Sequence, residues 1–437
     1  MQLPLRTLWV GLMVSSAAVS SAQTEPWSLA KALQTVEGAN VNVLLSREAA
    51  AQALAAANQQ RAGLLPNIAL SAQQRRTELV SVAASGTLTQ TPATNRFDGK
   101  LTGSLALLNP QQIAAYRSSR VGVAVAEADY LATVQSVMSL VAQTFFTHLR
   151  NLRRIDVLDA NTARAKALVD LARNQLNAGV ATQIDVTRAE SLLAQAEQAR
   201  LQQDTVVYQS AVLLQRLLDL DPARLLALAD FEVRRVNAGI FAEGFEQTTF
   251  MKRADWLRAQ KALEQAKLDV KTARFERLPI LGLGGEYGYV ATEVLDSTTK
   301  QAWFAGATVT MPIFDGLKSS ADQRAALSRQ RSQTARLKNL ELQISTELRL
   351  ATQDASSRFT QIAVAEKSLR LAEQELDLAQ KRFQQGVADN REIIEAQNRL
   401  AVASDGLVEA VYQYNLSRVE LARSKGDVRG ILAERIE

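Results

Sequence analysis

The chain contains a long internal repeat, and this repeat restricts the possible folds more than any other feature of the sequence. Residues 170–193 align without a gap with residues 377–400, and eight of the 24 aligned positions are identical. The register is nearly kept elsewhere, since Leu65 corresponds to Leu278. A period of about half the chain predicts two similar structural units rather than an array of short repeats.

The N-terminus has the pattern of an export signal. Arg6 precedes an apolar run at 8–19, and small residues at 20–22 are suited to cleavage. The apolar run is shorter than the roughly 20 residues that a membrane-spanning helix needs. We therefore expect a signal peptide at 1–22, followed by a first repeat at 23–240 and a second at 241–437.

Composition excludes several classes of protein. The sequence has no Cys, so it can form neither a disulfide nor a thiol-linked lipid anchor. It has 50 Lys and Arg against 45 Asp and Glu, and its aromatic content is only 5%. A small net charge, with basic and acidic residues mixed along the chain and few aromatic residues, argues against nucleic-acid binding. Beyond the N-terminal signal, the sequence lacks an apolar run long enough for a helical span.

Long helices dominate the predicted structure. Residues 110–177 contain one Gly and no Pro after the first position, and residues 317–385 contain neither. Each helix would be roughly 100 Å long at 1.5 Å per residue, so we expect coiled-coil packing. Each repeat is also predicted to have a lead-in helix, at about 29–64 and 241–277, and a return helix, at about 182–220 and 390–423.

Between the lead-in and long helices the pattern changes from helical to alternating. Apolar and polar residues alternate in 98–107, 279–290 and 301–311, and more weakly in 67–74. Segments of about ten residues with this period match tilted membrane β-strands. We therefore predict one β-hairpin in each repeat, at about 67–108 and 279–314.

Aromatic residues in the second hairpin suit a membrane interface. Tyr287, Tyr289 and Trp303 fall on the apolar side of the alternation, and Tyr and Trp are enriched where a bilayer meets water. The strands alone also fit a soluble hairpin with one buried face.

Four strands cannot close a membrane barrel, and an open edge in lipid leaves backbone groups without partners. If the hairpins enter a membrane, several chains must therefore combine their strands. Two chains would supply eight strands and three would supply 12. A two-fold repeat within a trimer would also give pseudo-sixfold packing of the helices.

Several strings of residues resemble one known family, the TolC-like outer-membrane factors of Gram-negative efflux and type I secretion systems. RAGLLPNI from Arg61 and RFERLPILGLGG from Arg274 lead into the first and third strands. LALLNP from Leu105 and MPIFDG from Met311 end the second and fourth strands. The two helix-return turns and KRADWLRAQ from Lys252 complete a resemblance that covers essentially the whole mature chain.

The resemblance implies a mixed α and β membrane protein that works as a homotrimer in the outer membrane. Three chains would form a 12-stranded barrel in the lipid and an α-helical tunnel in the periplasm. A periplasmic adaptor would dock on the helix tips and link the tunnel to an inner-membrane pump. The resemblance implies no enzyme activity and no cofactor.

The resemblance also assigns candidate site residues near the two helix-return turns. The tips that receive the adaptor would be Gly179 and Val180 in the first repeat and Gly386 and Val387 in the second. The acidic residues of the periplasmic constriction would be Asp185, Glu392 and Glu395. Glu392 and Glu395 also fit a simpler role, as acids near a helix N-terminus that are stabilised by the helix dipole.

Two positions depart from the family pattern. Phe383 and Ala388 stand where the best-known member has a Tyr and an Arg that close the tip. Neither side chain can make those hydrogen bonds, so we do not transfer that closed-state lock to this chain.

Catalytic and metal-binding motifs are missing from the sequence. Its single His, His148, can form neither a triad nor a metal site alone. The Gly-rich string at 282–285 lies within an alternating strand, unlike a dinucleotide-binding loop. The main alternative to a channel is a periplasmic coiled-coil adaptor, although two helical hairpins in tandem argue against it. The sequence does not choose between small molecules and polypeptides as substrates.

Overall fold

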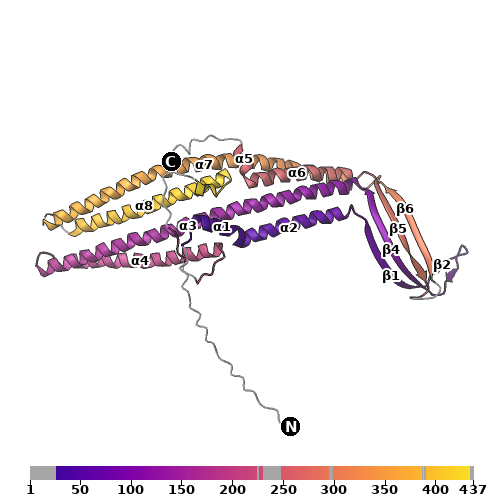
Figure 1. Ribbon diagram of the computed structural model, residues 1–437, viewed down its shortest axis with the longest axis horizontal. Coiled ribbons are helices and arrows are strands. Elements are labelled where there is room, and N and C mark those ends of the chain that lie inside the picture. The colour runs from indigo at the N-terminus through magenta and orange to yellow at the C-terminus, as the bar shows by residue number, and fades with distance from the viewer. Residues whose placement is uncertain are drawn as a thin grey trace, which may run out of the picture.

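The structure, a computed structural model, describes residues 26–223, 226–229, 248–294, 299–385, 387 and 390–433. The molecule is elongated, with helices along most of its length and a β-sheet at one end (Figure 1). The predicted fold class, long helical hairpins joined to a set of β-strands, is confirmed for the single chain. The predicted signal peptide and the boundary between the repeats at 240 and 241 lie outside the described residues.

Two long helices run from the sheet to the opposite end of the molecule (Figure 1). They are α3 (Pro110–Asn177) and α7 (Lys318–Gln384), close to their predicted extents. The side chain of Asn109 accepts a hydrogen bond from the Gln112 amide at 3.0 Å, and Pro110 takes the first helical position. Both residues favour a helix start at this point. The return helices are α4 (Gln183–Leu217) and α8 (Asn390–Lys425).

The lead-in helices are both broken, which corrects the prediction of continuous helices. The Asn40 side chain accepts a hydrogen bond from the Asn42 amide at 3.0 Å and caps a new helix. Arg253 interrupts the second lead-in helix. Its backbone is extended, as is that of Asn40. The first lead-in therefore consists of α1 (Leu29–Ala39) and α2 (Val41–Ala62), and the second of α5 (Thr248–Lys252) and α6 (Ala254–Phe275).

The four long strands form one antiparallel sheet in the order β1-β4-β5-β6. Each predicted hairpin pairs within itself, and the two halves of the chain meet where β4 pairs with β5. A small additional hairpin, β2 with β3, lies between β1 and β4 along the chain. The strands are β1 (Asn67–Thr77), β2 (Val80–Val82), β3 (Leu88–Gln90), β4 (Thr94–Leu108), β5 (Ile280–Ala291) and β6 (Lys300–Thr310).

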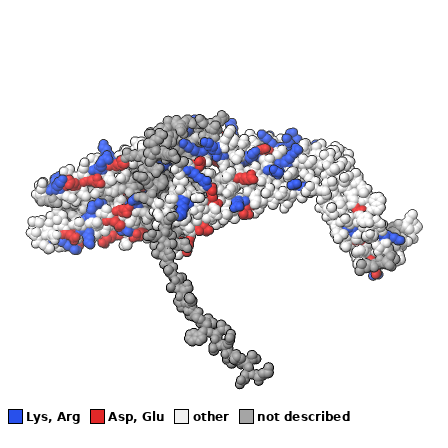
Figure 2. Space-filling view, in the orientation of Figure 1, with Lys and Arg blue, Asp and Glu red and all other residues white. Residues whose placement is uncertain are grey.

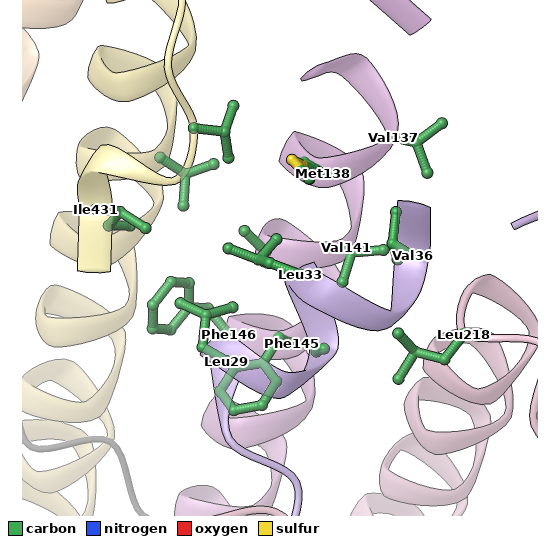
Figure 3. Close-up of a cluster of buried hydrophobic side chains, with 14 of the residues drawn as sticks. Leu29, Leu33, Val36, Val137, Met138, Val141, Phe145, Phe146, Leu218 and Ile431 are labelled. Carbon is green, nitrogen blue, oxygen red and sulfur yellow. The ribbon is translucent and has the colours of Figure 1, made fainter. Parts of the chain in front are cut away.

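The largest buried cluster lies where α1 crosses the middle of α3 (Figure 3). Leu29 and Leu33 of α1 pack near Phe145 and Phe146 of α3, whose rings meet edge to face at 5.9 Å between centroids. Ile431, in the short α9 (Gly430–Ala433), approaches the cluster from the other side. Burial of these side chains fixes the helical body near its middle, away from both the sheet and the tips.

A second buried cluster joins the two helical hairpins near their tips. It combines small and branched side chains from all four long helices, which allows close helix approach. Phe383 packs against this cluster. Its buried members are Leu168, Val169, Ala172, Val186, Ala189, Ala372, Leu376, Ala379, Ile393, Ala396 and Leu400.

Candidate functional site

One face of the sheet is apolar and largely exposed. Cross-strand pairing sets Leu70, Leu101, Tyr287 and Trp303 in a row across all four strands. Residues directly opposite one another in antiparallel strands point to the same side of the sheet. The Leu70 side chain is 81% exposed and that of Trp303 is 72% exposed. A continuous apolar row of this kind suits contact with lipid.

The predicted interface aromatics come together on this apolar face. The rings of Tyr287 and Tyr289 lie 6.2 Å apart in an edge-to-face arrangement. Trp303 pairs with Tyr287 across β5 and β6, and Gln301 donates to the Tyr287 hydroxyl at 3.1 Å. All three aromatics lie in the half of the sheet farther from the helices, because β5 ends and β6 begins there.

The opposite face of the sheet is polar. Asn67, Ser104, Gly284 and Gly306 form one row across it, and Ser71 and Lys100 belong to another. The Lys100 ammonium lies 3.1 Å from a Glu286 carboxylate oxygen. The sheet thus has the two-sided character of a wall between an apolar and an aqueous environment.

The first helix-return turn exposes the residues that the sequence singled out. Gly179 has a φ of +75°, a conformation that Gly adopts without steric cost. The amide of Val180 donates to the Gln175 carbonyl at 3.0 Å, which closes the end of α3. The Val180 side chain is 76% exposed, so an apolar side chain stands at the tip.

Asp185 uses its carboxylate to cap its own helix. Its Oδ2 accepts from the Thr182 hydroxyl at 2.6 Å and from the Thr182 amide at 3.0 Å. These hydrogen bonds, the hydroxyl first, hold the pKa of Asp185 below its ordinary value of 3.8. Thr182 and Asp185 thus form a capping box at the start of α4.

The second helix-return turn is described in part, because Gly386 and Ala388 lie outside the described residues. Val387 is exposed, and its amide donates to the Arg382 carbonyl at 3.0 Å. The turns of α3 into α4 and of α7 into α8 lie at the same end of the molecule (Figure 1).

The two acids of the second turn each face an arginine of their own chain. The Glu392 carboxylate lies 3.1 Å from the Arg382 guanidinium. The Glu395 carboxylate lies 3.0 Å from Arg391 and 4.0 Å from Arg399. These ion pairs partly offset the negative charge that a ring of carboxylates would otherwise present.

The sequence did not predict a buried ion network, although two of its members lie in the string KRADW at 252–256. The Arg253 side chain is 5% exposed and reaches Asp255 at 2.7 Å and Glu347 at 2.9 Å. Arg423 also contacts Glu347, at 3.4 Å. The network ties α6 to α7 and α8 near the middle of the helical body. In the sequence, the only indication of this network was Arg253 two residues before Asp255 at the start of a helix.

Other candidate chemistry is limited. His148 is buried, and its Nδ1 lies 2.8 Å from the Ser210 hydroxyl oxygen. Desolvation lowers the pKa of His148, which favours the neutral ring. Over the described ranges, acidic and imidazole groups form no cluster suited to a metal ion. Within the same ranges, every helix is too short or too polar to cross a bilayer.

The architecture consists of two tandem helical hairpins joined to a four-stranded sheet. The sequence pattern of the family described as Outer membrane efflux protein matches residues 32–219 and 249–427. The chain belongs to this family. The predicted resemblance to the TolC-like factors is thereby confirmed.

Similar curated proteins are export and efflux proteins of the outer membrane. The chain is 24% identical over 298 residues to the pyoverdine export outer membrane protein OpmQ of Pseudomonas aeruginosa, covering 68% of this chain and 62% of that one. It is 26% identical over 300 residues to outer membrane protein OprJ of the same organism, covering 67% and 61%. The chain thus spans about three fifths of the length of these relatives. Neither name denotes an enzyme.

Solved channels share the fold. The Campylobacter jejuni outer membrane channel CmeC matches with a TM-score of 0.80 and 21% identity, covering 93% of this chain and 89% of that one. The outer-membrane channel OprN matches with a TM-score of 0.81 and 19% identity, covering 91% and 89%.

Proposed function

We propose that this chain is the outer-membrane exit duct of a tripartite efflux or type I secretion assembly. The observation that carries the proposal is the four-stranded sheet, which is apolar on one face and polar on the other. Among the described residues, neither β1 nor β6 has a strand on its outer side. In lipid those edges need partners, and copies of the same sheet are suitable ones.

Three copies would supply 12 strands and close a barrel whose apolar face meets outer-membrane lipid. Tyr287, Tyr289 and Trp303 would lie at its outer interface. The long helices would then form a tunnel on the periplasmic side. Membership in a family of outer membrane efflux proteins favours this duct over a periplasmic adaptor.

The helix tips are the proposed docking sites for a periplasmic adaptor, which would connect the duct to an inner-membrane pump. Exposed Val180 and Val387 offer an apolar surface for helical hairpins of such a partner. Asp185, Glu392 and Glu395 would lie at the neck just inside these tips.

Two measurements on one purified sample test the proposal. Native mass spectrometry in detergent should give three chains per particle, and the same particles should give discrete conductance steps in a planar bilayer. Particles with a single chain, or trimers that never conduct, would overturn the duct.

A further inference from the structure

Ionised side chains gather around one carboxylate on the polar face of the sheet. The Asp98 side chain is 9% exposed, and the Nε and Nη2 atoms of Arg96 donate hydrogen bonds to its carboxylate at 2.8 to 3.0 Å. Arg75 approaches Asp98 to 3.7 Å from β1, and Lys100 to 3.9 Å along β4. Three cations thus surround one buried anion.

Cations outnumber anions on this face. Glu286 is its second acid and pairs with Lys100, while Lys300 lies on the same face opposite Val290. Over the strand residues the polar face carries four cations and two anions, a net charge of +2 for each chain. Glu293, just beyond β5, accepts a hydrogen bond at 3.3 Å from Asn95, which belongs to the opposite face.

The excess positive charge lies toward the free end of the sheet. Arg75 and Arg96 pair with each other near the end of β1 and the start of β4, and Lys300 begins β6. In Figure 2 the visible surface of the sheet is largely uncharged, and its charged side chains lie mainly in the half farther from the helices. In the proposed duct this half is the outer mouth, and its polar face lines the lumen.

The helix tips do not present a matching excess of negative charge. Glu392 and Glu395 form ion pairs with arginines of the same chain at 3.1 and 3.0 Å. On the polar face of the sheet, Asp98 and Glu286 are also paired with cations. The four cations of that face outnumber these two acids. Rings of Arg and Lys in a pore attract anions.

We propose that the outer mouth is an anion-selective segment and that the duct exports organic anions, such as carboxylates with an apolar body. The Phe304 side chain would contact the apolar body of such an anion, because it is exposed on the same polar face, directly opposite Glu286. This inference rests on the proposed function, because the charges face a lumen only in a closed barrel. Counted over the strand residues of the polar face alone, three chains would carry about six excess positive charges, enough for a local potential of several kT.

Reversal potentials of single channels test the inference. The purified protein is placed between unequal potassium chloride solutions and then between unequal potassium benzoate solutions. The double variant Arg75→Gln with Lys300→Gln removes the excess charge but keeps the Arg96–Asp98 and Lys100–Glu286 pairs. Arg76→Gln is the matched control, because Arg76 is the next residue of β1 and lies on the opposite face.

The unmodified channel is expected to prefer chloride and benzoate over potassium. The double variant should lower each anion-to-cation permeability ratio at least roughly threefold, the effect of about one kT. Arg76→Gln should leave both ratios unchanged, and Glu286→Gln should raise them. The preference should fade in about 1 M salt, where the Debye length is about 3 Å.

The failure of this inference differs from the failure of the duct itself. A conducting trimer that prefers potassium, or whose selectivity ignores Arg75 and Lys300, would overturn the anionic substrate class and leave the duct intact. A protein that neither assembles nor conducts would overturn the proposed function, and the inference with it.

Discussion

Asn40 and Arg253 occupy equivalent positions in the two halves of the chain, at the offset that relates Leu65 to Leu278, and both interrupt a lead-in helix. Asn40 Nδ2 donates to the Leu217 carbonyl oxygen at 2.9 Å. Arg253 Nη1 donates at 3.4 Å to the carbonyl oxygen of Ser424, the counterpart of Leu217 in the second repeat. Two different side chains therefore connect a helix break to the end of a return helix in the same way.

Replacing Arg253 with Met should destabilise the helical body strongly. The change leaves Asp255 and Glu347 partly buried without their shared cation, and breaking a buried ion pair costs about 3–5 kcal/mol. The free energy of unfolding, from urea titration in detergent followed by helical circular dichroism, measures this cost. Arg258→Met is the control, since its pair with Asp129 is half exposed and should contribute under about 1 kcal/mol. Equal losses in the two variants would contradict the role of burial.

The same network should make stability fall in acid. Desolvation raises the pKa of both Asp255 and Glu347. Hydrogen bonds and the charge of Arg253 lower both pKa values by a larger amount, so each lies below its ordinary value of 3.8 or 4.5. Groups with a lowered folded pKa contribute stability above their unfolded values, and the contribution is lost as the pH falls through the folded pKa. The unfolding free energy should therefore decline below about pH 4.5. In Arg253→Met this decline should be shallower.

Gly288→Ala should disturb the pairing of β4 with β5, where the two halves of the sheet meet. A Cβ at Gly288 would lie 2.2 Å from the Gly99 carbonyl oxygen, which is closer than atoms can approach. Overpacking that forces the backbone to shift typically costs about 1–3 kcal/mol. Thermal unfolding of the protein in detergent should show a lower midpoint. Gly284→Ala, in the same strand with open space around it, should keep the midpoint, and a similar drop there would contradict this steric explanation.

The regular elements could be predicted because their patterns are local. Long runs with almost no Pro or Gly specify α3 and α7, and period-two alternation specifies the faces of the sheet. The breaks at Asn40 and Arg253 escaped prediction because they depend on partners far along the chain, Leu217 and Ser424. Helix propensity at either position gives no warning of such contacts.

The charged cluster on the polar face of the sheet was predicted only in part, because it too depends on contacts between distant segments of the chain. Alternation indicated that Asp98 and Lys100 share the polar face of the sheet, but not that Arg75 and Glu286 join them from β1 and β5. That grouping depends on cross-strand register, which the sequence of one strand does not specify. The tip residues were assigned by resemblance, and their roles in docking and constriction stay predictions.

Asp185→Asn should loosen the start of α4. The substitution weakens the hydrogen bonds that the carboxylate accepts from the Thr182 hydroxyl and amide, and losing a helix cap costs about 1 kcal/mol. Amide hydrogen exchange in the first turn of α4 should accelerate roughly fivefold, which corresponds to about 1 kcal/mol. Asp170→Asn, in the exposed part of α3, serves as the control. Because the folded pKa of Asp185 is lowered, the unmodified tip should loosen in the same way as the pH falls below 3.8.

Glu392→Gln combined with Glu395→Gln tests whether these acids line a neck of the duct. Removing both carboxylates leaves Arg382 and Arg391 without the partners they now hold at 3.1 and 3.0 Å, so the local charge becomes positive. If the acids face the lumen, the potassium permeability of the trimer relative to chloride should fall roughly threefold, the effect of about one kT in local potential. Asp377→Asn is the control, because Asp377 pairs with Lys381 at 2.6 Å on the same helix hairpin. Unchanged selectivity in the double variant would mean that the two glutamates serve only in the ion pairs with arginines of their own chain.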